Sequence, residues 1–231
     1  MDPQEELNKV LAQKIFYTFD SKILVDWAVM MMQNGLESES LIILAGLDNE
    51  STEEREQYFL RAIEELKLDN SKSENDLLDY YATYVAESVI NKKIKPLDGL
   101  TLMLNIVLAT DYSDKYIQFY YINEDLDYLQ NYQPAIFSSG LSLENKENYI
   151  LKEFELLLES NKYKIDNKIR ELAFCNICQT INKSILRTKR NWIGQKKYDI
   201  WVCGNCGSND ILSFNNQKGK EIILNKIKNA T

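Results

Sequence analysis

The sequence predicts a mainly α protein, in which an irregular multi-helical N-terminal domain is followed by a small three-stranded domain. Apolar residues recur at helical spacing through most of the first 160 residues. All four cysteines of the 231-residue chain lie after residue 170, in two Cys-x-x-Cys pairs. The distribution of charge changes at the same point. From Glu171 onward the chain has ten Lys and Arg and four Asp and Glu, whereas the residues before it include 17 Lys and Arg and 31 Asp and Glu. We therefore expect an acidic all-helical domain over 1–168, the small domain over 169–215 and a basic C-terminal tail over 216–231.

The composition is that of a globular protein, with 45% hydrophobic and 27% charged residues. No apolar run reaches the roughly 20 residues that a membrane-spanning helix needs. The N-terminal MDPQEELNK lacks the basic and apolar regions of a secretory signal. These observations predict a cytoplasmic protein that makes no membrane contact, and a reducing compartment suits cysteines that act as thiolates.

The expected helices begin at capping residues or at a proline in the first turn. Asp2-Pro3-Gln4-Glu5 and Ser51-Thr52-Glu53-Glu54 combine a capping side chain with a reciprocal glutamate. Apolar residues at steps of three and four follow each start and predict one buried face per helix. The predicted helices start near Asp2, Ser21, Ser38, Ser51, Leu77, Pro96 and Ser142.

The helical pattern weakens over residues 111–133, where six tyrosines alternate with five acidic residues. Rigid aromatic side chains supply contact energy in protein interfaces, and negative charge steers a basic partner. This pattern predicts a surface that binds a basic protein, while the alternative is that the tyrosines pack between helices. The partner-binding candidates are Tyr120, Tyr121, Asp125, Asp127 and Tyr128.

The C-terminal part changes to short β-like segments separated by turn-forming residues. Three strands are predicted, over 180–186, 198–202 and 211–214. The first strand follows Cys175-x-x-Cys178, and the third follows Cys203-x-x-Cys206; the two pairs are separated by 24 residues. Two such pairs can place four thiolates around one zinc ion, which is tetrahedral in structural sites.

The two cysteine motifs, CNIC and CGNC, resemble the knuckles of the zinc-ribbon family over roughly residues 170–215. Gln179 stands where a glycine is common, which predicts a less regular first knuckle. The resemblance implies one structural zinc held by Cys175, Cys178, Cys203 and Cys206. Iron uses the same ligand geometry in rubredoxins and is the alternative metal; disulfides or a redox Cys-x-x-Cys fit a reducing compartment and two motifs less well.

Basic residues lie between the two cysteine pairs, interleaved with Trp192, Tyr198 and Trp201. Such a set can follow a phosphate backbone and stack on unpaired bases. The alternative is a solvated basic face, or one that docks on the acidic helices. The nucleic-acid candidates are Arg187, Lys189, Arg190, Lys196 and Lys197.

The sequence predicts no catalytic site. Histidine is absent, which removes the commonest general base, and no glycine-rich phosphate loop or G-x-S-x-G motif occurs. The segments 41–66 and 84–103, with their LAGL text and the Pro96-x-x-Gly99 turn, resemble a group of uncharacterised bacterial all-helical proteins, which implies a fold and no activity.

Two functional hypotheses follow from these residues. The first is a non-catalytic protein that binds a basic partner through its acidic part, in one version an antidote or immunity protein that neutralises a toxin. The second is a nucleic-acid-binding or regulatory protein that acts through the basic zinc ribbon.

Overall fold

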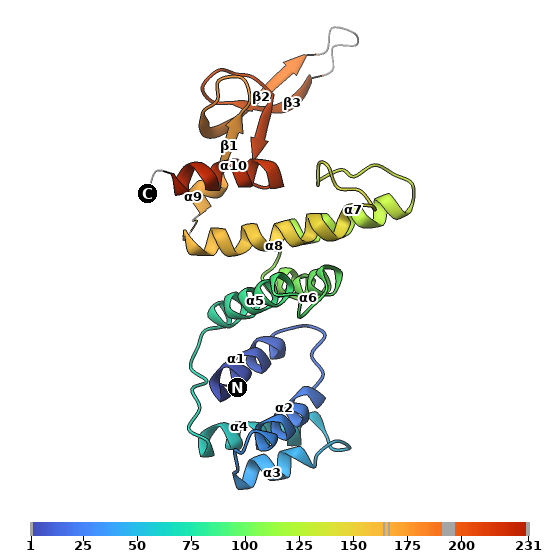
Figure 1. Cartoon of the computed structure of the whole chain (residues 1–231), viewed down its shortest axis with the longest axis vertical. Coiled ribbons are helices and arrows are strands. Elements are labelled where there is room, and N and C mark those ends of the chain that lie inside the picture. The colour runs from blue at the N-terminus through green and yellow to red at the C-terminus, as the bar shows by residue number, and fades with distance from the viewer. Residues whose placement is uncertain (1, 164, 166, 191–196, 230–231) are drawn as a thin grey trace. The chain divides into compact units, whose positions relative to one another are not determined.

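The computed structural model describes residues 2–163, 165, 167–190 and 197–229. These residues form ten helices and four strands (Figure 1). The helices are α1 (Pro3–Lys14), α2 (Lys22–Gln33), α3 (Glu39–Ala45), α4 (Thr52–Glu65), α5 (Glu74–Ile90), α6 (Pro96–Ala109), α7 (Ile117–Gln130), α8 (Lys146–Lys162), α9 (Asn167–Arg170) and α10 (Gln217–Lys228). The strands are β1 (Leu172–Cys175), β2 (Ile181–Arg190), β3 (Lys197–Cys203) and β4 (Ile211–Ser213).

The predicted mainly α class is confirmed, and Asp2, Ser38 and Ser51 act as caps, whereas the side chain of Ser21 makes no capping hydrogen bond. The side chain of Asp2 accepts from the backbone of Gln4, and that of Ser51 accepts from Glu54, so each fixes the first turn of its helix. None of the helices in the described part of the chain is long and apolar enough to cross a membrane.

The chain forms two compact units. The first comprises residues 1–85 and 101–112, and the second comprises 86–100 and 113–231. The expected boundaries at 168 and 215 therefore lie inside the second unit. In the first unit α1 to α4 enclose a core in which Trp27 meets Phe59 edge-to-face, with ring centroids 5.0 Å apart.

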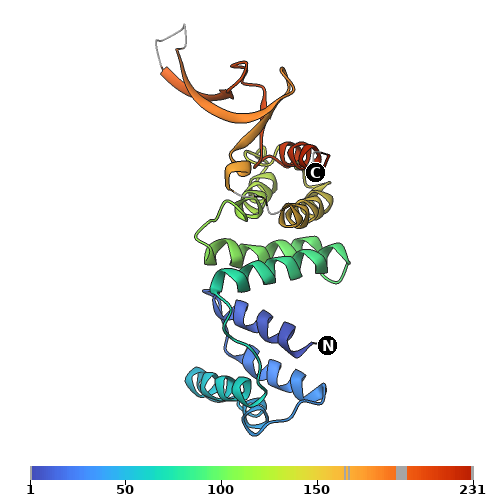
Figure 2. The ribbon, with the colours of Figure 1, turned by 90° about the vertical axis from the view of Figure 1, so that its left-hand side faces the viewer.

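The sheet of the second unit has four antiparallel strands in the order β3-β2-β1-β4. The predicted count of three strands is wrong, because the short strand β1 was missed. β1 pairs with both β2 and β4, so it lies at the centre of the sheet: Leu172 faces Lys183, and Phe174 faces Leu212. The β2–β3 hairpin extends away from α8 and α10 (Figure 2).

Within the expected basic tail, Gln217–Lys228 form α10, which packs on α8, β1 and β4. Ile223 and Leu224 of α10 are fully buried and join a core with Phe174 and Phe214. Lys220 of α10 forms a buried ion pair with Glu153 of α8. This core fixes the base of the sheet on which the cysteines lie.

Candidate metal centre and adjoining surfaces

The first cysteine pair lies in a tight turn between β1 and β2. The backbone amide of Gln179 donates to the carbonyl of Cys175 at 2.9 Å, and the amide of Cys175 donates to the carbonyl of Thr180 at 3.0 Å. Gln179 adopts the left-handed conformation, with φ +58°. This conformation turns the chain back toward the first cysteine and costs a residue with a Cβ about 1–2 kcal/mol.

The second pair, which follows β3, forms the same turn. The amide of Gly207 donates to the carbonyl of Cys203 at 2.9 Å, the amide of Cys203 donates to Ser208, and Gly207 has φ +75°. The expectation of a less regular first knuckle is wrong. Gln179 accepts the backbone angle that Gly207 takes freely, and its side chain donates to the carbonyl of Asn176 at 2.6 Å.

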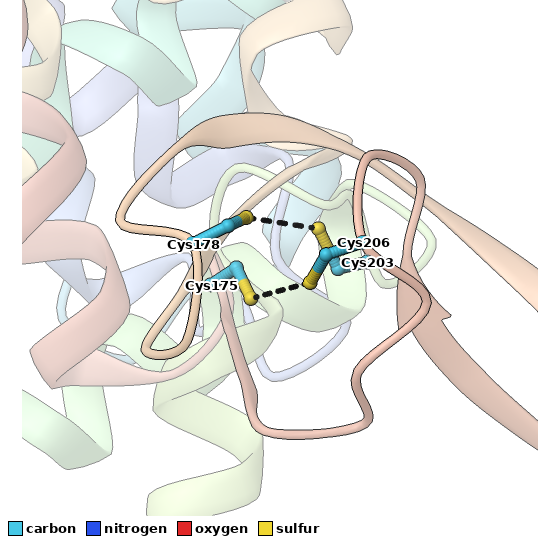
Figure 3. A group of neighbouring side chains, drawn as sticks. All are labelled: Cys175, Cys178, Cys203 and Cys206. Atoms are coloured by element: carbon cyan, nitrogen blue, oxygen red, sulfur yellow. Dashed lines mark hydrogen bonds between the residues drawn. The ribbon is translucent and has the colours of Figure 1, made fainter.

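The two knuckles bring all four sulfurs together (Figure 3). The Sγ atoms of Cys175 and Cys206 are 3.6 Å apart, as are those of Cys178 and Cys203. All four atoms lie within 4.8 Å of one another. A disulfide needs about 2.05 Å, whereas the corners of a tetrahedron with 2.3 Å zinc–sulfur bonds are about 3.8 Å apart. The four cysteines are therefore positioned to bind one metal ion.

Polar groups around the sulfurs orient them and donate to them. The hydroxyl of Thr180 lies 3.1 Å from the sulfur of Cys178, and the side-chain amide of Asn182 donates to Cys203 at 3.2 Å. The carbonyl oxygen of the same amide accepts from the backbone of Gly204. Sequence reasoning did not identify Thr180 or Asn182, whose only signal is their place two and four residues after Cys178.

These contacts shift the pKa values of Cys178, Cys203 and Cys206. The hydrogen bond with Thr180 lowers the pKa of Cys178 to about 6. The pKa of Cys203 is also lowered, first by the backbone amide of Cys206. The pKa of Cys206 is raised to about 12: the amide of Ser208 acts to lower it, but desolvation and the sulfurs of Cys175 and Cys178 outweigh that effect. Four thiolates in this volume therefore require a cation, since like charges at such distances suppress one another's ionisation.

Helix α10 also touches the first knuckle. The ammonium group of Lys226 donates to the carbonyl of Gln179 at 3.0 Å and lies 5.1 Å from the ring centroid of Phe174. The C-terminal helix and the first cysteine pair are thus linked through one residue.

The basic candidates lie on the β2–β3 hairpin, which is exposed on both faces over residues 185–190 and 197–199 and is buried at Val202 and Cys203. Directly paired residues share a face, so Lys189 lies beside Tyr198 on one face and Arg190 beside Lys197 on the other. The guanidinium of Arg187 lies against the second knuckle, with Nη1 3.0 Å from the position a Cβ on Gly207 would take. The candidate Lys196 lies outside the described residues.

The five partner-binding candidates lie on α7. Asp127 is exposed, whereas Tyr120, Tyr121 and Tyr128 are half-buried. Asp125 is fully buried and accepts hydrogen bonds from three backbone amides of the following loop. Its carboxylate therefore stabilises the fold and is not itself part of the exposed surface.

Comparisons of this chain with protein families, with curated proteins and with solved structures returned no match. The resemblance of 41–66 and 84–103 to bacterial all-helical proteins has no support from these comparisons. The assignment of a metal site rests on the distances between the four sulfur atoms.

Proposed function

We propose that the four cysteines hold one structural zinc ion and that the β2–β3 hairpin it supports binds single-stranded nucleic acid. Four thiolates fill a tetrahedral zinc site and leave no open position for a substrate, so the metal stabilises the sheet. Native mass spectrometry of the purified protein should find one zinc per chain. One iron per chain would support the four-cysteine metal site and would show that its metal is iron and not zinc.

The observation that carries the nucleic-acid proposal is the exposure of a basic, aromatic hairpin. Its described strands contain five Lys and Arg and one acidic residue, Asp199. The carboxylate of Asp199 accepts a hydrogen bond from the hydroxyl of Thr188 at 2.6 Å. Trp201 is 58% exposed and Tyr198 48% exposed. Exposed aromatic rings beside cations can stack on unpaired bases while the cations contact phosphates, at about 1–3 kcal/mol per stacked base.

The register gives the two faces different chemistry. Lys189 and Tyr198 form a cross-strand pair on one face, where a phosphate and its base could be held together. Leu186 and Trp201 pair on the other face and are both exposed. We therefore assign phosphate contacts near the far end of the hairpin to Lys189 on the face of Tyr198 and to Arg190 on the face of Trp201. Arg187 lies against the second knuckle and is given no such role.

The test is a titration of a fluorescein-labelled oligothymidylate with the zinc-loaded full chain, followed by anisotropy. Charge reversal in Lys189→Glu/Arg190→Glu should weaken binding by about tenfold or more and flatten its salt dependence. The matched control is Lys92→Glu/Lys93→Glu, which makes the same charge change at two exposed lysines between α5 and α6. Equal affinities of the two variants would reject the hairpin as the binding surface.

A second candidate function is the binding of a basic protein through α7 and the loop that follows it. Residues 117–140 contain three acidic residues and no Lys or Arg, which favours a positively charged partner. A protein that neutralises a basic toxin, as an immunity protein does, is one form of this function.

A further inference from the structure

The buried carboxylate of Asp125 holds the loop after α7 in one conformation. Its Oδ1 accepts from the amide of Ile136 at 2.6 Å, and its Oδ2 accepts from the amides of Phe137 at 2.9 Å and Ser138 at 2.5 Å. A carboxylate is costly to bury unless such donors satisfy it. Three consecutive amides around one carboxylate make this a fixed loop.

The fixed loop presents apolar side chains to solvent. Ile136 is 64% exposed and Phe137 is 44% exposed. The ring of Phe137 stacks on Tyr121 of α7, with centroids 4.7 Å apart and planes at 15°. Folding alone would favour burial of these side chains, whereas a preformed exposed aromatic pair lowers the entropy cost of binding a partner.

A cavity of about 270 Å³ opens beside this aromatic pair. Tyr121 and Phe137 line it from α7 and the loop after that helix, and β4 and the residues after it supply further lining. The volume is below the range usual for cofactors and drug-sized ligands, and it suits a single long side chain. Gln118 also lines the cavity; it is buried, and its Oε1 accepts no hydrogen bond among the described residues.

The lining residues of the cavity are uncharged, and the segments that supply them favour a cation by their acidic residues. Besides the buried Asp125, residues 117–140 and 207–217 contain three carboxylates, on Glu124, Asp127 and Asp210, and no Lys or Arg. Asp127 and Asp210 are exposed. A cation is attracted to the outer ring face of a stacked aromatic pair, and the buried, unpaired oxygen of Gln118 accepts a hydrogen bond from a donor that reaches it.

We propose that the cavity between the Tyr121–Phe137 pair and β4 receives a lysine or arginine side chain from a basic segment of a partner protein. Ile136 contacts the same segment, and Asp125 is a positioning residue that holds the loop. The proposal deepens the second candidate function and rests on it, because it names the site and the occupant. It extends the contact surface from Tyr121 of α7 to Ile136 and Phe137 in the loop after that helix.

The experiment selects peptides from a random phage-displayed library on the full chain and measures their affinities by fluorescence anisotropy. We expect selected peptides to carry Lys or Arg and to lose at least tenfold in affinity for Phe137→Ser and Ile136→Ser. The matched control, Ile42→Ser on α3, replaces an isoleucine that is 53% exposed and should leave the affinity unchanged. Both test variants change exposed side chains, so the fold is retained.

Asp125→Asn tests the positioning role. It should weaken the selected peptide in the wild-type chain and have no further effect in the Phe137→Ser chain, as a double-mutant cycle requires of two residues that act as a unit. Peptides without Lys or Arg, or equal affinity for the wild-type and Phe137→Ser chains, would overturn the proposal. Basic peptides that bind independently of Phe137 would overturn this site while leaving the second candidate function in place.

Discussion

The helical core of the first unit and the cysteine-bearing sheet of the second solve the problem of stability in different ways. Thirteen described hydrophobic residues are buried in the core that α1 to α4 enclose. The core beneath the sheet has six, and three of them, Leu156, Ile223 and Leu224, belong to helices α8 and α10. The sheet itself buries few apolar side chains; α10 packs on one end of it, and at the other end lie the four cysteines that we propose to hold a metal.

Metal removal should have the largest effect. It should destabilise the sheet of the second unit and leave the helical core of the first unit folded. Zinc binding supplies about 10 kcal/mol or more to small four-thiolate modules. Treatment with a strong zinc chelator should remove amide-exchange protection from β2 and β3 and leave α2 and α4 protected. Hydrogen exchange followed by mass spectrometry measures this directly. Retained protection in both strands would show that the sheet is stable without its metal.

A substitution in the helical core should destabilise the first unit and leave the metal site of the second intact. Trp27 is 1% exposed and packs on Phe59, so Trp27→Ala should destabilise the first unit by about 3–5 kcal/mol. The zinc content of the variant should remain one per chain. The control is Tyr17→Ala, at a residue that is 86% exposed, with a change within about 0.5 kcal/mol. Loss of zinc in Trp27→Ala would mean that the metal site depends on the helical core.

The two knuckles give the smallest predicted effects. Gly207→Ala should weaken zinc binding by about 1–2 kcal/mol, because alanine bears the left-handed penalty and its Cβ would crowd Arg187. Gln179→Gly should change it by less than about 1 kcal/mol, since relief of the same penalty is offset by the entropy of glycine. Competition with a chromophoric chelator measures both. A larger loss for Gln179→Gly would contradict the equivalence of the knuckles.

Much of the helical architecture could be predicted because its signals are local. Asp2, Ser38 and Ser51 cap the helices that their sequences predict. The cysteine cluster could also be predicted, since four thiolates at this spacing have few other uses. Strand β1 is too short, at four residues, to show an alternating pattern.

The acidic segment could not be interpreted fully from sequence, because buried polar residues interrupt its apolar stripe. Gln118 and Asp125 occupy buried positions of α7, so the helical period is weak. The partners of Asp125 are backbone amides 11 to 13 residues further along, which no local pattern indicates. Asp125 was therefore predicted as a contact residue, whereas the structure buries it.

The most direct test asks whether nucleic-acid binding by the β2–β3 hairpin depends on the metal. Anisotropy of the labelled oligothymidylate should be followed on the wild-type chain before chelation, after chelation and after zinc is restored. We predict that affinity falls on chelation and returns with zinc, because the hairpin that presents Lys189, Arg190 and Tyr198 is held at its base by the four cysteines. An affinity unchanged by chelation would contradict the account.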